Sequence, residues 1–161
     1  MFKIRKSIIL ETFKAFKMNK LETIGSSVKI NFPRLGLNNV PARVDTGAKT
    51  SAIWATIIKE EDNLLYFTLF ADNSPHYLDL VYITPHYRKK RVRSTSGITE
   101  RRYVVKLVVE INGRFINASF TLANRHRQVY PILIGRNILR GKYIVDIKHR
   151  KTIKSVKDGK N

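Results

Sequence analysis

One acidic tripeptide, Asp45-Thr46-Gly47, is the stretch of this sequence whose residue types and spacing best suit chemistry. An acid after a predicted apolar strand, followed by a small hydroxyl residue and a glycine, fits a tight turn. In such a turn, backbone N–H groups and a hydroxyl hold the carboxylate. A carboxylate can activate water when a second carboxyl group lies beside it. Two like charges about 3 Å apart cannot both ionise, so the two groups share one proton. The turn therefore presents a carboxylate that is suited to acid–base chemistry, such as the activation of water.

This turn supplies only one of the two acids. The chain has a single Asp-Thr-Gly and no internal repeat, and the other acids that could be proposed, Asp72, Asp79 and Asp146, lack the Thr-Gly context. The second acid must then come from another copy of Asp45 across a two-fold axis. The sequence thus predicts an active homodimer, in which Thr46 links the two loops.

A second motif follows later in the chain, where the apolar run Ile132-Leu133-Ile134 ends in Gly135 and continues as Arg136-Asn137. The apolar run predicts a strand that packs against the acidic loop, because glycine allows two backbones to approach closely. The next residues, Ile138-Leu139, predict one short helical turn.

In this order the two motifs resemble the catalytic loop and the Gly-Arg-Asn segment of retropepsins. Further stretches are similar to a bacterial family of retropepsin-like proteins often labelled ATP-dependent zinc proteases: 43–52 (RVDTGAKTSA), 92–94 with Gly97, 101–105 (RRYVV), 122–125 (LANR), and 134–136 with 145–146. The resemblance covers roughly residues 25–150 and implies that Asp45, Thr46 and Gly47 form the catalytic loop. It also implies a functional link with ATP-grasp ligases that add glutamate. One departure is Trp54, where members usually have a histidine.

Positive charge surrounds the predicted catalytic loop. Retroviral members have an acid where this chain has Lys49, and that acid pairs with the arginine that corresponds to Arg136. Here both residues are basic, so either Arg136 pairs with another carboxylate, such as Asp146, or the cleft stays electropositive. An electropositive cleft would suit substrates rich in glutamate or aspartate, whereas the same charges could also be paired or solvated. The residues predicted to bind substrate are Arg43, Ala48, Lys49, Arg93, Ser96, Gly97, Arg101 and Arg136.

Residues 86–102 form a basic segment around the small residues 94–97, which read as a hairpin tip. In the family picture, this hairpin is the flap that closes over substrate; the alternative is a surface hairpin with solvated charges. Its cations are Arg88, Lys89, Lys90, Arg91, Arg93, Arg101 and Arg102.

Alternating apolar residues from Val28 onward indicate β structure. Asn112-Gly113, between two such stretches, is a strong hairpin signal. The pattern predicts an all-β domain, a closed or partly open barrel of the retropepsin-like acid protease fold, with one short helix after Ile134-Gly135-Arg136. Strands are predicted at 28–32, 40–44, 50–58, 64–70, 77–83, 103–111, 115–122 and 131–134.

The domain is predicted to span residues 25–156, between a basic N-terminal arm (1–24) and a disordered tail (157–161). The arm suits a docked amphipathic segment, a membrane-surface helix or a frayed end. Thr152, Ile153 and Val156 could add a last strand.

Bulk composition excludes some classes of function. The chain has 161 residues and no cysteine, so neither a disulfide framework nor a thiolate site is available. No apolar run approaches the ~20 residues of a membrane span, and the N-terminus lacks a secretory signal. We therefore expect a cytoplasmic protein. The net charge of +19 suits any anionic partner.

Cofactors find no support in the sequence. The four histidines, His76, His86, His126 and His149, are scattered without metal-ligand spacing, and no phosphate-binding Gly-rich loop ends in Gly-Lys-Ser/Thr. We therefore expect neither zinc nor ATP.

Two functions remain at this stage. One is a homodimeric aspartic endopeptidase acting on acidic or glutamate-rich peptides, such as poly-glutamate tails added by a ligase. The other is a peptidase-like fold that serves as a basic binding module for RNA, the ribosome or an acidic protein.

Overall fold

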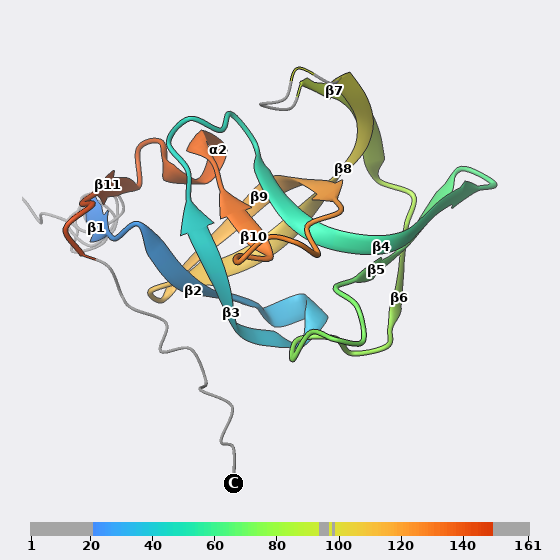
Figure 1. The fold of residues 1–161 in the computed structure, drawn as a ribbon, viewed down its shortest axis with the longest axis horizontal. Helices are drawn as coiled ribbons and strands as arrows, with labels where there is room; N and C mark the ends of the chain where they lie inside the picture. The colour runs from blue at the N-terminus through green and yellow to red at the C-terminus, as the bar shows by residue number, and fades with distance from the viewer. Residues whose placement is uncertain (1–20, 94–96, 98, 150–161) are drawn as a thin grey trace, which may run out of the picture.

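The computed structural model describes residues 21–93, 97 and 99–149 (Figure 1). Strands dominate these residues, which confirms the predicted all-β class. The strands are β1 (Glu22–Ile24), β2 (Ser27–Phe32), β3 (Leu37–Val44), β4 (Ser51–Glu61), β5 (Leu64–Leu69), β6 (Val81–Thr84), β7 (Tyr87–Arg93), β8 (Thr99–Ile111), β9 (Arg114–Ala123), β10 (Ile132–Ile134) and β11 (Tyr143–Val145). A 3-10 turn, η1 (Pro33–Leu35), follows β2, and the predicted short helix is α2 (Arg136–Leu139).

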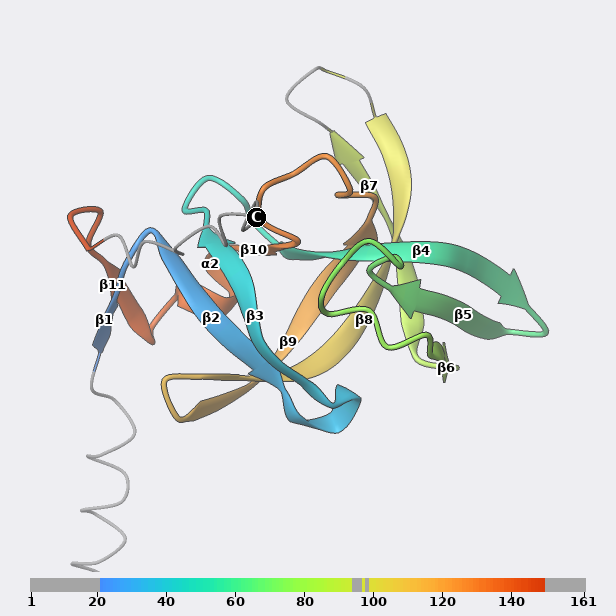
Figure 2. The ribbon, with the colours of Figure 1, turned by 60° about the horizontal axis from the view of Figure 1, so that its bottom comes forward.

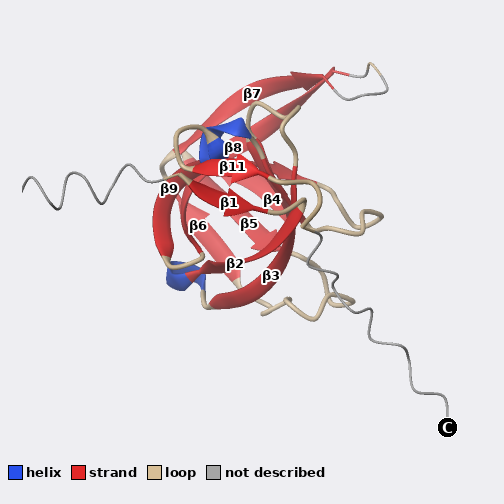
Figure 3. Ribbon diagram, turned by 90° about the vertical axis from the view of Figure 1, so that its left-hand side faces the viewer, coloured by secondary structure: helices blue, strands red, loops and turns tan. Residues whose placement is uncertain are grey.

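Strands β10, β3, β2, β8, β9 and β4 form a ring around the core (Figure 3). The ring closes because the short strand β10 pairs in parallel with β3 and antiparallel with β4. Alternate residues of β3, namely Val40, Ala42 and Val44, are buried inside it. At its centre the rings of Phe32 and Phe120 lie 5.7 Å apart. The predicted barrel is thus a ring of strands within a larger sheet.

Strand β4 belongs to two parts of this sheet. Its first four residues pair with β9, whereas its second half pairs with β5, which in turn pairs with β6. A bulge between Thr56 and Lys59, with Ile57 at φ 48°, marks the irregular point of the strand. Figures 1 and 2 show β4 and β5 reaching out beyond the ring.

Strand β7 pairs only with the first half of β8, from Tyr87–Val105 to Arg93–Thr99. The two strands make a hairpin that projects beyond the ring (Figure 2). The predicted basic hairpin is therefore present. Ser96, predicted to bind substrate, lies outside the described residues.

The ends of the described chain lie together, because β1 and β11 form a separate parallel pair. β1 lies within residues 1–24, which the sequence assigned to the arm. Residues 1–20, the tail and the predicted last strand near Ile153 lie outside the described residues. In the described part of the chain, no helix is both long and apolar enough to cross a membrane.

Local sequence predicted most strand positions. The Asn112-Gly113 turn has both residues at positive φ, 51° and 80°, and joins β8 to β9 as predicted. The strand predicted at 77–83 was wrong in its first half: β6 begins at Val81. Asp79 adopts φ 52° and accepts a hydrogen bond from the Tyr77 hydroxyl, which suits a loop.

Candidate active site

Asp45 follows directly after β3 and begins the loop that leads to β4. Its backbone N–H donates to the carbonyl of Ile134 in β10 (2.9 Å). Its carboxylate Oδ1 accepts hydrogen bonds from the backbone N–H groups of Gly47 (2.9 Å) and Ala48 (3.2 Å). The side chain is half-buried. Backbone N–H groups of the loop therefore fix the orientation of a carboxylate that solvent still reaches.

Gly135 lies beneath this loop, at a point where a side chain would not fit. A Cβ there would lie 2.8 Å from the Thr50 carbonyl carbon and 2.9 Å from the Ala48 oxygen. Contacts under 3.0 Å with backbone atoms require the loop to shift. The Gly135 N–H donates to the Ser51 hydroxyl (3.0 Å), and the Arg136 N–H donates to the Ala48 carbonyl (2.8 Å). The apolar strand and glycine thus support the acidic loop.

Arg136 does not pair with Asp146, the carboxylate suggested for it. Its guanidinium donates to the carbonyl oxygens of Thr46 (3.1 Å) and Gly47 (3.0 Å). Asp146 instead accepts from the Lys148 backbone N–H and contacts His149, interactions that lower its pKa. Arg136 therefore stabilises the Asp45 loop through backbone carbonyls, and no carboxylate of residues 21–93, 97 and 99–149 pairs with it.

Asn137, which the sequence analysis did not assign to the site, links three segments. Its side-chain oxygen accepts from both the backbone N–H and the hydroxyl of Ser51, each at 2.8 Å, and its amide donates to the Ser119 carbonyl (2.8 Å). Ser51 is fully buried. Since buried polar groups need partners, this network joins α2, β4 and β9 beneath the Asp45 loop.

Arg125 was part of the family resemblance, but nothing in the local sequence placed it at the site. It is half-buried and donates twice to the Tyr130 carbonyl (3.2 and 3.1 Å). Burial lowers the pKa of Arg125, and the nearby positive charge of Arg102 lowers it further. The negative charge of Asp45 raises it. Arg125 therefore lies close enough to Asp45 to contribute positive charge to the site.

The other residues predicted to bind substrate occupy three places. Arg43 is exposed on β3, two residues before Asp45, and Lys49 is exposed in the loop. Arg93 and Arg101 are exposed on the hairpin, and Gly97 lies between them at φ 83°. The structure thus collects Arg43, Ala48 and Lys49 at the loop, while Arg93, Gly97 and Arg101 belong to the projecting hairpin.

The root of the hairpin is fixed by Glu60, which lies in β4 beyond the end of the strand predicted at 50–58. Its carboxylate accepts from the hydroxyls of Tyr87 (2.7 Å) and Tyr103 (2.8 Å) and pairs with Lys89. These hydrogen bonds lower the pKa of Glu60 to about 2, and the bond from Lys89 has the largest effect. The bond to Glu60 raises the pKa of Tyr87 to about 12.

Residues suitable for a zinc site do not come together. Within residues 21–93, 97 and 99–149, no group of three or more His, Cys, Asp or Glu side chains is placed to hold a metal ion. His76 packs on Phe70, and His149 contacts Asp146. Trp54, which replaces the family histidine, is buried against Phe70. The residues present do not fit the zinc that the family label implies.

Comparison with known proteins identifies the family. The model of the RimB-like family, described as retropepsin-like aspartic endopeptidase RimB, matches residues 24–156. The chain belongs to the RimB-like family. The match includes the Asp45 loop, the basic hairpin and the Gly135 segment.

Curated relatives of this RimB-like chain carry a different name. Proteins from Shewanella pealeana and Parasynechococcus marenigrum, each called probable alpha-L-glutamate ligase, are 32% identical over 127 and 133 residues, or 76% and 80% of this chain. The chain spans only 28% of the length of either relative.

A solved structure supports the RimB-like fold. A protein of unknown function from Legionella pneumophila has 26% sequence identity and a TM-score of 0.65, covering 83% of this chain and 98% of its own. The fold thus occurs elsewhere as a nearly complete chain of its own.

Proposed function

We propose that this protein is a homodimeric aspartic endopeptidase. The observation that carries the proposal is the Asp45 carboxylate, accessible to solvent and held by the amides of Gly47 and Ala48. Nothing in the ring of strands requires an acid there, whereas peptide hydrolysis does. Family membership supports the same reading.

Catalysis would use the Asp45 carboxyl groups of two chains, sharing one proton. The ionised group takes a proton from water as the water oxygen attacks the scissile carbonyl carbon, and the other group gives its proton to the carbonyl oxygen. In the collapse of the tetrahedral diol, the first group gives the proton it took from water to the leaving nitrogen, and the second takes a proton from a diol hydroxyl. The C–N bond breaks, leaving a carboxylic acid and an amine, and the pair of carboxyl groups again shares one proton. In each chain, Arg136 and Asn137 would keep the loop in place, so that little reorganisation is needed.

Acidic or glutamate-rich peptides are the substrates we propose. Lys49 and Arg43 flank Asp45, and Arg125 lies close enough to interact with its charge. This cluster would attract carboxylates and speed their association. The names of the relatives support glutamate chemistry, since proteins called glutamate ligases contain a segment similar to this chain. A link with a ligase that adds glutamate is part of the proposal.

The alternative is a basic binding module for RNA, the ribosome or an acidic protein. The net charge of +19 favours it, and the projecting hairpin offers a cationic surface. A binding module would have no use for Asp45.

The decisive experiment compares the wild-type chain with Asp45→Asn in a screen of peptides that contain glutamate runs. We expect wild-type cleavage, inhibition by a statine-type transition-state mimic, persistence after EDTA dialysis, and loss in Asp45→Asn. Light scattering at micromolar concentration should give about twice the 18.7 kDa chain mass. Cleavage by Asp45→Asn, or by a strictly monomeric protein, would refute the shared dyad.

A further inference from the structure

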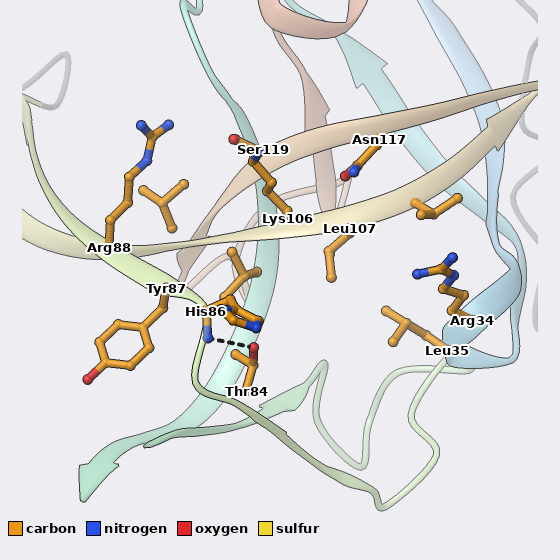
Figure 4. A pocket seen from close by; sticks show the side chains of 13 residues that line it. Arg34, Leu35, Thr84, His86, Tyr87, Arg88, Lys106, Leu107, Asn117 and Ser119 are labelled. Carbon is orange, nitrogen blue, oxygen red and sulfur yellow. Dashed lines mark hydrogen bonds between the residues drawn. The ribbon is translucent and has the colours of Figure 1, made fainter. Parts of the chain in front are cut away.

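Two adjoining depressions cross the outer face of β7, β8 and β9. Both are lined by Arg88, Asn117 and Ser119, so they are neighbours. One reaches the catalytic loop at Lys49 and Thr50. The other continues to η1 at Arg34 (Figure 4). Together they make a path that leads away from Asp45.

Cations line this path, and none of the described residues that line it is a carboxylate. In the described part of the chain, Arg34, Arg88 and Lys106 have no ion-pair partner. Lys90 donates to the Thr50 hydroxyl (2.8 Å). By contrast, Lys89, which also lines the path, pairs with Glu60, and Arg102 pairs with Glu100. We define the cationic track as Lys49, Lys90, Arg88, Lys106 and Arg34.

The spacing of these cations matches an extended peptide. Lys90 lies opposite Arg102 and Arg88 lies opposite Val104, while Lys106 is two residues further along β8. Measured along β8, the three cations therefore lie at the levels of residues 102, 104 and 106, so each is two residues, or about 6.8 Å, from the next. In an extended acidic peptide, every second side chain lies on the same side with the same repeat. Alternate carboxylates could thus each meet a cation.

We propose that the cationic track is an exosite, which holds an extended acidic peptide segment outside the catalytic loop. The proposal rests on the proposed function in that the segment belongs to the substrate, but the binding itself requires no catalysis. Sites for single-stranded nucleic acid stack bases on aromatic rings, so an RNA site would need such rings along the track. An acidic peptide needs only the cations and therefore fits better. Two aromatic residues line the track: Tyr87 packs against Tyr103 and bonds Glu60, which leaves His86 as the exposed ring.

The test measures anisotropy of a fluorescent deca-glutamate peptide bound to the full-length Asp45→Asn chain at ~50 mM salt. Arg88→Glu with Lys106→Glu should raise Kd at least about tenfold, equivalent to about 1.4 kcal/mol. The matched control, Lys29→Glu with Lys148→Glu, changes the net charge equally at exposed positions outside the track. It should change Kd less than about threefold, or about 0.7 kcal/mol. Unfolding curves of both double variants exclude loss of fold.

A cleavage assay separates the exosite from the active site. With Asp45 restored, the track variant should cleave a short serine-flanked peptide like the wild type, but show a higher KM for the same core extended by glutamates. Equal weakening of deca-glutamate binding by both double variants would overturn the proposal in favour of general charge attraction. Tighter binding of oligouridylate, lost in the track variant, would overturn it in favour of RNA. If no peptide is cleaved, the anisotropy result still decides the exosite.

Discussion

The Asp45 loop and the β7–β8 hairpin are held in opposite ways. The loop rests on Gly135 and on the hydrogen bonds of the buried Ser51 with Asn137. The hairpin is fixed at its root by the partly exposed cluster around Glu60. Close packing and buried hydrogen bonds define one geometry, whereas exposed charge contacts are weaker and respond to pH and salt. A catalytic acid needs the fixed geometry that close packing provides. A surface that admits and releases substrate is better served by weaker, exposed charge contacts.

Substituting glycine in each region should give the largest contrast. In Gly135→Ala, the new Cβ would lie 2.8 Å from the Thr50 carbonyl carbon. We expect a loss of about 3 kcal/mol in the free energy of unfolding, the upper part of the range for overpacking. Gly97→Ala, strained only by its φ of 83°, should cost about 1 kcal/mol. Urea unfolding measures both, and equal losses would mean that the loop is not tightly supported.

Removing the side chain of Asn137 should have the next largest effect. Asn137→Ala leaves the buried Ser51 without the acceptor for its N–H and hydroxyl, which should cost about 2 kcal/mol in unfolding free energy. Peptidase activity should fall with it, because Ser51 also accepts from the Gly135 N–H. The control Asn124→Ala removes an exposed contact with His126 and should cost less than about 0.5 kcal/mol. If Asn137→Ala lost as little unfolding free energy as Asn124→Ala, Asn137 would not be a support of the loop.

The contrast also explains what sequence can predict. The loop is encoded by short motifs, Asp45-Thr46-Gly47 and Ile134-Gly135-Arg136, whose turn and close-approach requirements are local. The Asn112-Gly113 hairpin is local in the same sense. The Glu60 cluster joins residues 27 and 43 positions apart, and it depends on β4 continuing past the predicted turn. Likewise, Arg125 reaches Asp45 only through the fold. Contacts between distant residues leave no periodic signal in the sequence.

Acidification should loosen the hairpin and leave the loop intact. The folded-state pKa of Glu60 is about 2, below its ordinary value of 4.5. Its stabilising effect is therefore present above about pH 4.5 and declines as the pH falls toward 2. Hydrogen exchange across residues 87–105 should accelerate over this range, relative to exchange near Asp45. Glu60→Gln should show fast exchange already at pH 6.

Glu61→Gln is the control for this prediction. Glu61 pairs only with the exposed Lys59 on the same strand, so its substitution should leave exchange of the hairpin unchanged. Uniform exchange across β7 and β8 from pH 6 to 2, after correction for intrinsic rates, would show that Glu60 does not anchor the hairpin.

Charge beside the loop should have the smallest effect, because it acts through water. We consider two peptides with one scissile core, flanked by glutamates or by serines, at ~50 and ~300 mM salt; at 0.1 M the Debye length is ~10 Å. The glutamate peptide should have the higher kcat/KM at low salt, and the advantage should shrink at high salt. Lys49→Glu should reduce the ratio of the two kcat/KM values about fivefold, since reversing an exposed charge changes the energy by about 1 kcal/mol. Lys29→Glu, on β2 away from the loop, should leave the ratio nearly unchanged. If the wild type cleaves both peptides equally at low salt, the basic surface does not select substrate. The cations at the loop would then serve another partner, and the binding module would become the better account of the charge.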